Sequence, residues 1–177
     1  MPLTETQIIY GALAALLVFW AVGAHNRLVR LRTTLVQQFG SVNEQCARRH
    51  ALLEQQVDAL GAVLPAAAPR LDALRAACRQ VEAACAHARP RPGTISAITS
   101  LKLAEEILVE ARARLPVQRV VGTELPELGQ ELAHIDTTLA FARRQFNDSV
   151  QAYNDAVRQF PTRLIAGLFN FRTAGSL

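Results

Sequence analysis

Thiol and imidazole side chains are the groups in this sequence with the clearest capacity for chemistry. Cys46 and His50 are four residues apart, which places them on one side of a helix, and Cys78 and Cys85 follow on a later segment. A structural metal site needs about four such ligands to converge. The sequence has no CxxC, HxxxH or HExxH motif to supply them. We therefore expect no metal and no cofactor. The four residues remain candidates for an alternative function, a small-molecule or metal sensor that binds between helices.

A cluster of carboxylates in LAEEILVEARARL is a second candidate site. Glu105, Glu106 and Glu110 lie close together in the chain, but no ExxH motif accompanies them. Glu110 and Arg114 have the spacing of an ordinary ion pair on a helix surface. We therefore expect this cluster to be a solvated face. The sequence also has no nucleophile elbow and no glycine-rich phosphate loop. The expected protein is not an enzyme.

Charge and cysteine content restrict the class of partner and the compartment. The formal net charge is +4, and Lys102 is the only lysine, so the positive charge comes from arginines spread along the chain. No dense basic patch with interleaved aromatic residues occurs, and we expect no nucleic-acid partner. Three cysteines are an odd number without the spacing of a disulfide framework. They favour free thiols in a reducing compartment.

An uncharged segment, IIYGALAALLVFWAVGA, occupies residues 8–24. At 1.5 Å per residue it spans about 25 Å, which is enough for a bilayer core once its flanks are added. A cleaved signal peptide is the alternative, but MPLTETQ lacks the positive residues that precede such peptides. Arg27, Arg30 and Arg32 instead follow the segment, and cationic residues stay on the cytoplasmic side. We expect a retained anchor in the inner membrane, with the N-terminus outside and the bulk of the chain in the cytoplasm.

The remaining sequence has the periodicity of long amphipathic helices. Apolar residues recur mostly every three or four positions from Leu28 to Leu64, where Pro65 ends the pattern. Similar patterns predict a second helix over about 69–88, a third over about 96–115 and a last one from near Pro126 to near Phe160. RPRPGT and PVQRVVGTELPE are the breaks between them.

An aromatic residue followed by asparagine recurs in the last helix, at Phe146-Asn147 and Tyr153-Asn154. These aromatic residues lie on a seam whose members are three or four positions apart: Leu132, Ile135, Leu139, Ala142, Phe146, Val150, Tyr153, Val157 and Phe160. The asparagines lie about 100° around the helix, where an amide is half-buried against a neighbouring helix and fixes register by a hydrogen bond. Pro161 must end the run.

These elements predict an all-α fold, with a single N-terminal transmembrane helix that continues into an antiparallel up-and-down bundle of long helices. The cytosolic part of the first helix spans about 55 Å and the last helix about 50 Å, so the chain returns to the membrane plane. The expected parts are a short extracytoplasmic N-terminus (1–7), the transmembrane helix (8–24), a cytoplasmic bundle (25–160) and an apolar C-terminal segment (161–177).

The C-terminal segment, RLIAGLFNFRTAGSL, is rich in apolar residues but too short to span a bilayer. One interpretation is that it folds back and caps the core of the bundle. The other is that it lies in the cytoplasmic interface of the membrane beside the anchor, with Arg163 and Arg172 facing anionic headgroups. The sequence alone leaves both interpretations open.

The last helix resembles the signature of the LemA family, an Ala-Arg pair, two aromatic-Asn pairs and then Phe-Pro. The matching positions in ARRQFNDSVQAYNDAVRQFP are Ala142, Arg143, Asn147, Tyr153, Asn154, Phe160 and Pro161. HNRLVRLRTTLVQQFGSVNEQCARRHALLEQQV is similar to the first cytosolic helix of that family, which also follows an N-terminal membrane segment. The resemblance implies a bacterial membrane-anchored helical bundle without an established catalytic activity.

Two departures from the family pattern affect the expectations. LLEQQV, residues 52–57, replaces the usual LIPNLV, so the first helix should be straighter, and Asp136 replaces the usual glutamate. We expect a non-enzymatic scaffold or protein-interaction module. Its expected partners are the lipid bilayer, through residues 8–24, and an unknown protein on the cytoplasmic side, and an oligomer is compatible with the sequence. The candidate interaction or register residues are Arg143, Asn147, Tyr153, Asn154 and Pro161.

Overall fold

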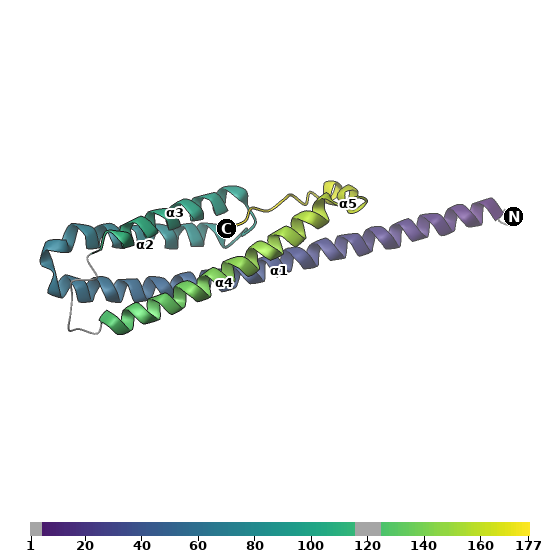
Figure 1. Ribbon diagram of the computed structural model, residues 1–177. Coiled ribbons are helices and arrows are strands. Elements are labelled where there is room, and N and C mark those ends of the chain that lie inside the picture. Colours follow the sequence, from purple (N-terminus) through teal and green to yellow (C-terminus); the bar gives the residue numbers. More distant parts are fainter. Residues whose placement is uncertain (1–4, 116–124) are drawn as a thin grey trace.

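One continuous helix, α1 (Glu5–Val63), forms the long axis of the protein in the computed structural model, which describes residues 5–115 and 125–177 (Figure 1). No proline interrupts the helix over this length. It ends because Leu64 precedes Pro65 and adopts φ −127° and ψ 71°, outside the helical region. The helix thus passes from the apolar segment into the bundle without a break.

The N-terminal third of α1 is long and apolar enough to cross a membrane. Only 6% of its most apolar 18-residue window is buried inside the protein, so the apolar residues do not serve the bundle core. Burial begins near the end of this segment, at Ala24 and Leu28. The candidate membrane-spanning helix predicted for residues 8–24 is therefore present as a helix whose apolar side chains face outward.

A short hairpin of helices follows α1. The 3-10 turn η1 (Pro65–Ala67) leads into α2 (Ala68–Ala88), and a tight turn at Arg89–Thr94 leads into α3 (Ile95–Ala113). The apolar stripe predicted for α2 is buried in full: Leu71, Leu74, Cys78, Val81 and Cys85. PVQRVVGTELPE, the predicted connection to the last helix, lies largely outside the described residues.

The last long helix, α4 (Leu125–Arg158), carries the predicted seam. Eight of its nine predicted positions are buried: Leu132, Ile135, Leu139, Ala142, Phe146, Val150, Tyr153 and Val157. Phe160 was predicted to be the ninth, and this is wrong, because its side chain is 76% exposed. The helix ends at Arg158, because the helical conformation is disfavoured for the residue that precedes Pro161. The Phe160–Pro161 peptide bond is cis.

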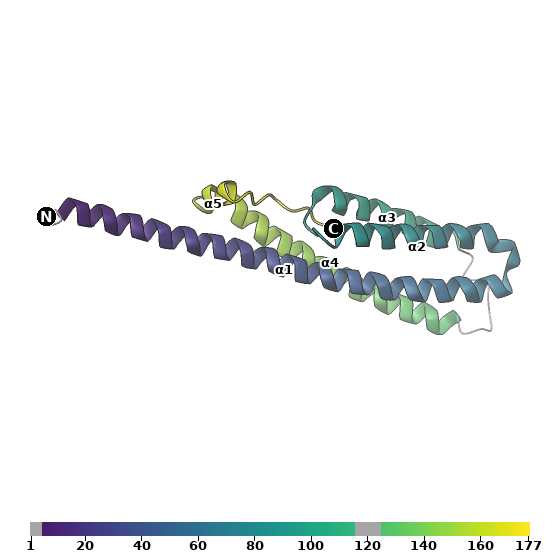
Figure 2. The same ribbon diagram turned by 180° about the vertical axis from the view of Figure 1, so that it is seen from behind.

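The helices run up and down, as predicted, with α1 packed along α4 and α2 packed against both α1 and α3 (Figures 1 and 2). Phe39 of α1 and Phe146 of α4 meet edge to face, with ring centroids 5.6 Å apart. A short helix, α5 (Thr162–Leu168), contacts α1 and α4 at the end of the bundle nearer the N-terminus of α1. The prediction of an all-α antiparallel bundle is confirmed.

The chain reverses after α5. Asn170 has φ 55°, a left-handed conformation that asparagine tolerates better than most residues. The N–H groups of Asn170 and Phe171 donate to the carbonyl groups of Gly167 and Ala166, the pattern of a Schellman motif. The last residues then run without regular structure back over the bundle, and the C-terminus lies beside the α2–α3 hairpin (Figure 1).

Candidate functional site

The two asparagines of the aromatic-Asn repeat bind the returning C-terminal chain, residues 170–177, which we call the tail. The side-chain amide of Asn154 donates to the carbonyl oxygen of Ala174 at 2.9 Å, and its Oδ1 accepts the N–H of Ala174 at 2.7 Å. Asn147 makes the same pair of bonds to Leu177, both at 2.7 Å. Each amide therefore satisfies one donor and one acceptor of the tail backbone.

The spacing of these bonds explains why the repeat is seven residues long. Seven residues of an α-helix rise by about 10.5 Å. The three steps from Ala174 to Leu177 span about 10 Å when a chain is extended. Two asparagines seven apart on one helix face thus match two residues three apart in an extended segment. We call Asn147 and Asn154 the amide clamp.

In the structure, the two asparagines have a different hydrogen-bond partner from the one that the sequence predicted. We expected each amide to hydrogen-bond to a neighbouring helix, and both instead bind the tail. Their half-buried position is as expected.

Tyr153, next to Asn154, is buried in the core, and burial raises the pKa of its phenol. Pro161 is exposed and begins the turn into α5.

The other side of the tail lies against the α2–α3 turn. The N–H of Gly175 donates to the carbonyl oxygen of Gly93 at 3.1 Å. A Cβ on Gly175 would lie 3.2 Å from the Cα of Ile95, and a Cβ on Gly93 would lie 3.0 Å from the Cβ of Ala174. The tail thus lies between α4 and this turn, and it approaches the turn so closely that a Cβ at Gly93 or Gly175 would be crowded.

A group of charges, buried at Arg49 and Glu105 and partly exposed at its other members, links three helices. Glu105 of α3 is 8% exposed and accepts from Arg49 of α1 at 2.5 Å, and its second oxygen lies 2.8 Å from Arg143 of α4. Nη1 of Arg112 on α3 donates to both carboxylate oxygens of Asp136 on α4, at 2.9 and 3.2 Å. We call these five residues the ion cluster. The family-signature residue Arg143 is thus a partner in the ion cluster and does not belong to the amide clamp.

The prediction that Glu105 lies on a solvated face is wrong. Glu106 and Glu110 are exposed as predicted, and Glu110 pairs with Arg114. Burial alone would raise the pKa of Glu105, but the adjacent guanidinium groups of Arg49 and Arg143 outweigh it and hold the pKa below its usual range. The cluster therefore keeps a carboxylate charged inside the bundle.

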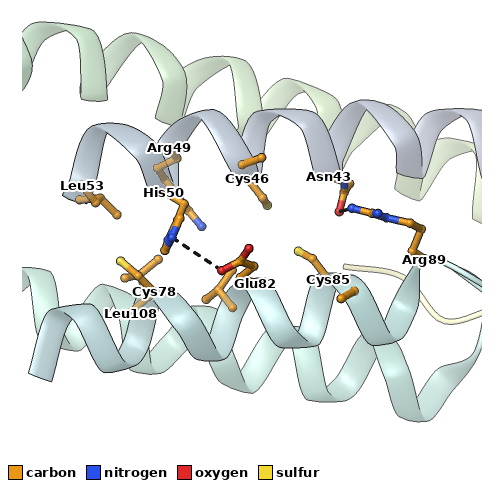
Figure 3. A pocket seen from close by; sticks show the side chains of 13 residues that line it. Asn43, Cys46, Arg49, His50, Leu53, Cys78, Glu82, Cys85, Arg89 and Leu108 are labelled. Carbon is orange, nitrogen blue, oxygen red and sulfur yellow. Dashed lines mark hydrogen bonds and ion pairs between the residues drawn. The ribbon is translucent and has the colours of Figure 1, made fainter. Parts of the chain in front are cut away.

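The four sequence candidates for a sensor site lie around one cavity between α1 and α2. The cavity has a volume of about 460 Å³, and Cys46, His50, Cys78 and Cys85 all line it (Figure 3). His50 lies 3.7 Å from a carboxylate oxygen of Glu82 across the cavity. Within the described residues, no three histidine, cysteine or carboxylate side chains converge as a metal site would require.

The three thiols around this cavity differ in acidity. A hydrogen bond with the Cys85 thiol lowers the pKa of Cys46, which outweighs the opposite effect of burial. The same bond, together with burial, raises the pKa of Cys85. Burial raises the pKa of Cys78 to about 11. Of the three thiols, only Cys46 has a lowered pKa, and its Sγ donates to a carboxylate oxygen of Glu105 in the ion cluster at 3.9 Å.

Sequence reasoning gave folding back of the C-terminal segment as one of two interpretations, but it missed the contact of the amide clamp with the tail and it missed the ion cluster. The repeat of asparagines at a seven-residue interval was a signal for a partner with a matching repeat, but nothing in the sequence identified the tail as that partner. Glu105 gave no such signal, since its neighbours on α3 are solvated glutamates.

The comparisons with known proteins agree with the resemblance of the last helix. The model of the LemA family matches residues 38–177, which include the ion cluster, the amide clamp and the tail. Neither a search of curated proteins nor a search of solved structures returns a match. A match over most of the chain establishes the family, and this protein belongs to the LemA family.

Proposed function

We propose that the protein is a non-enzymatic scaffold at the bacterial inner membrane whose cytoplasmic bundle binds a protein partner. The amide clamp is the observation that carries this proposal. Asn147 and Asn154 bind an extended chain through its backbone groups, which every partner segment also has. Recognition of an extended segment by main-chain hydrogen bonds is a general mode of peptide binding.

In the proposed mechanism the tail occupies the amide clamp. An extended segment of a partner would exchange with the tail, and the tail would keep the clamp occupied when no partner is present. The continuous helix α1 supports a scaffold role, because it transmits the position of the anchor to the bundle without a flexible linker. The proposed orientation places the bundle in the cytoplasm, since Arg27, Arg30 and Arg32 follow the membrane segment.

Proximity labelling in cells tests this proposal, with the labelling enzyme inserted within residues 116–124, between α3 and α4 in the chain. The full-length protein should recover a reproducible set of partners. Deletion of residues 170–177 should increase recovery, because it leaves the amide clamp free for a partner. Asn147→Ala together with Asn154→Ala should reduce recovery in that deletion background. Labelling that is indistinguishable from that of an unrelated anchored helix would contradict the proposal.

A sensor that binds a small molecule is the second candidate, and the cavity between α1 and α2 favours it. Arg89 and Asn43 meet at one end of the cavity, His50 and Glu82 face one another across it, and Leu53 lies in its wall (Figure 3). A ligand with both polar and apolar parts would suit this lining.

Elemental analysis and thermal unfolding of the purified full-length protein separate the versions of the sensor. A stoichiometric metal, together with a melting temperature that falls on chelation, would support a metal sensor. A co-purifying organic molecule whose removal lowers the melting temperature would support the small-molecule version, and Glu82→Gln should weaken it. Absence of both effects would contradict the sensor.

A further inference from the structure

The short helix α5 has two faces, and only one of them is covered by the protein. Thr162, Ile165 and Ala166 are buried against the bundle. Leu164 and Leu168 on the opposite face are 62% and 77% exposed. A helix of seven residues that exposes this much apolar surface needs a partner for its outer face.

The apolar surface extends beyond the helix at both ends. Phe160, immediately before the turn into α5, and Phe169, immediately after the helix, are both exposed by more than half. Together with Leu164 and Leu168 they are the large exposed apolar residues of this segment, and we call these four residues the α5 patch. No acidic residue occurs between Phe160 and Leu177.

The position of the α5 patch along α1 identifies what covers it. The ring of His25 lies 4.5 Å from the ring of Phe169 and 5.7 Å from that of Phe171, measured between centroids. His25 directly follows Ala24, the last residue of the apolar segment 8–24. The exposed apolar surface of α5 therefore begins where the exposed apolar surface of the anchor ends.

The exposed charged residues of α1 just beyond the apolar segment and of the C-terminal segment are positive. Arg27 and Arg30 are exposed on α1, one and two turns beyond the apolar segment. Arg163, within the sequence of the α5 patch, and Arg172, after it, are also exposed. The first acidic residue of α1 beyond the segment is Glu44. Exposed arginines next to an apolar segment complement the anionic headgroups of a lipid leaflet.

We infer that α5 is an interfacial helix that binds the bilayer surface beside the anchor. Phe160, Leu164 and Leu168 insert among the headgroups and upper acyl chains, and the four arginines contact anionic lipid. The inner face of α5 packs on the bundle at the same time, so the C-terminal segment both caps the core and contacts the membrane. The bundle then has two membrane contacts, and these fix its tilt as well as its distance from the bilayer. This inference concerns lipid and is independent of any protein partner.

Fluorescence quenching by brominated lipids tests the inference in the full-length protein reconstituted into vesicles. Trp20 is the only tryptophan, so a Trp20→Phe background with Leu168→Trp gives a single reporter at the α5 patch. Leu168 is exposed, and its replacement leaves the core intact. Val109→Trp is the matched control, because Val109 is also an exposed apolar residue, 61% exposed, but lies on α3. The native Trp20 is the positive control for quenching.

The expected result is that brominated lipid quenches the tryptophan at position 168 at least about twofold more strongly than the one at position 109. Quenching at position 168 should fall when anionic lipid is replaced by zwitterionic lipid, or when Arg163→Glu and Arg172→Glu are introduced. Equal quenching at positions 168 and 109 would overturn the inference. A blue-shifted emission at position 168 without quenching would also overturn it, because a second copy of the chain or another protein would then cover the patch.

Discussion

Asn154 and Ala174 form a two-point hydrogen-bonded pair in which the side-chain amide of one residue satisfies both backbone groups of the other. The same pair forms between Asn147 and Leu177. A single asparagine at one of these positions would hold one point of the tail and leave it free to pivot. Two of them, seven residues apart, fix its direction and its register on α4.

Removal of one clamp residue should release the tail and leave the core folded. Asn154→Ala deletes two hydrogen bonds, each worth about 1 kcal/mol, and the released backbone groups regain water. We expect amide hydrogen exchange at Ala174 to accelerate, with a loss of at most about 2 kcal/mol in the free energy of unfolding. Asp155→Ala is the matched control, because Asp155 is the exposed neighbour of Asn154 on the same helix. Unchanged exchange at Ala174 would show that the clamp does not hold the tail.

The neighbouring tyrosine should behave differently from the clamp. Tyr153 is 4% exposed in the core, and truncation of a large buried aromatic residue leaves a cavity. Tyr153→Ala should lower the free energy of unfolding by about 3 kcal/mol or more, measured by denaturant unfolding of the protein in detergent. A loss no larger than that of Asn154→Ala would place the ring outside the core.

The close approach of the tail to α3 gives a steric prediction. Gly175→Ala would add a Cβ 3.2 Å from the backbone Cα of Ile95, which cannot move without disturbing α3. We expect the tail to be displaced and proteases to cleave it faster in the native protein. Gly167→Ala is the control, because nothing lies within 4 Å of a Cβ there and alanine is the better helix former. Equal cleavage rates for the two variants would contradict the enclosed position of the tail.

Local patterns in the sequence predicted the helices and most of the core, and they did not predict the contacts between distant segments. The seam from Leu132 to Val157 was visible because its period is a property of one helix. Phe160 continued that period, but the proline after it ended the helix first. Ala174, the partner of Asn154, lies 20 positions away in the chain, and Arg49, the partner of Glu105, lies 56 positions away. Only the packing of the bundle brings such residues together.

The orientation of the anchor is a separate prediction. A reporter that is active only in the cytoplasm, inserted in the connection 116–124, should be active, because the arginines after residue 24 resist translocation. Replacement of Arg27, Arg30 and Arg32 by glutamine should reduce that activity in the same fusion. Activity of a periplasm-only reporter at the same position of the unaltered protein would reverse the proposed topology.

The ion cluster predicts how stability depends on pH. The pKa of Glu105 is lower in the folded protein than its ordinary value, so the folded state binds fewer protons than the unfolded state as pH falls. The contribution of the charged Glu105 to the stability of the fold is complete above the ordinary pKa of glutamate, about 4.3. It is lost as pH falls through the lower pKa of Glu105 in the folded protein. The melting temperature of the wild-type protein should therefore fall across this acidic range. Glu105→Gln should lower it at neutral pH, since Arg49 then lies buried without its carboxylate, and should flatten its decline in acid. Glu110→Gln is the control, because it alters only an exposed ion pair, and it should retain the wild-type dependence of melting temperature on pH. If the melting temperature of Glu105→Gln falls in acid as steeply as that of the wild type, other carboxylates cause the decline.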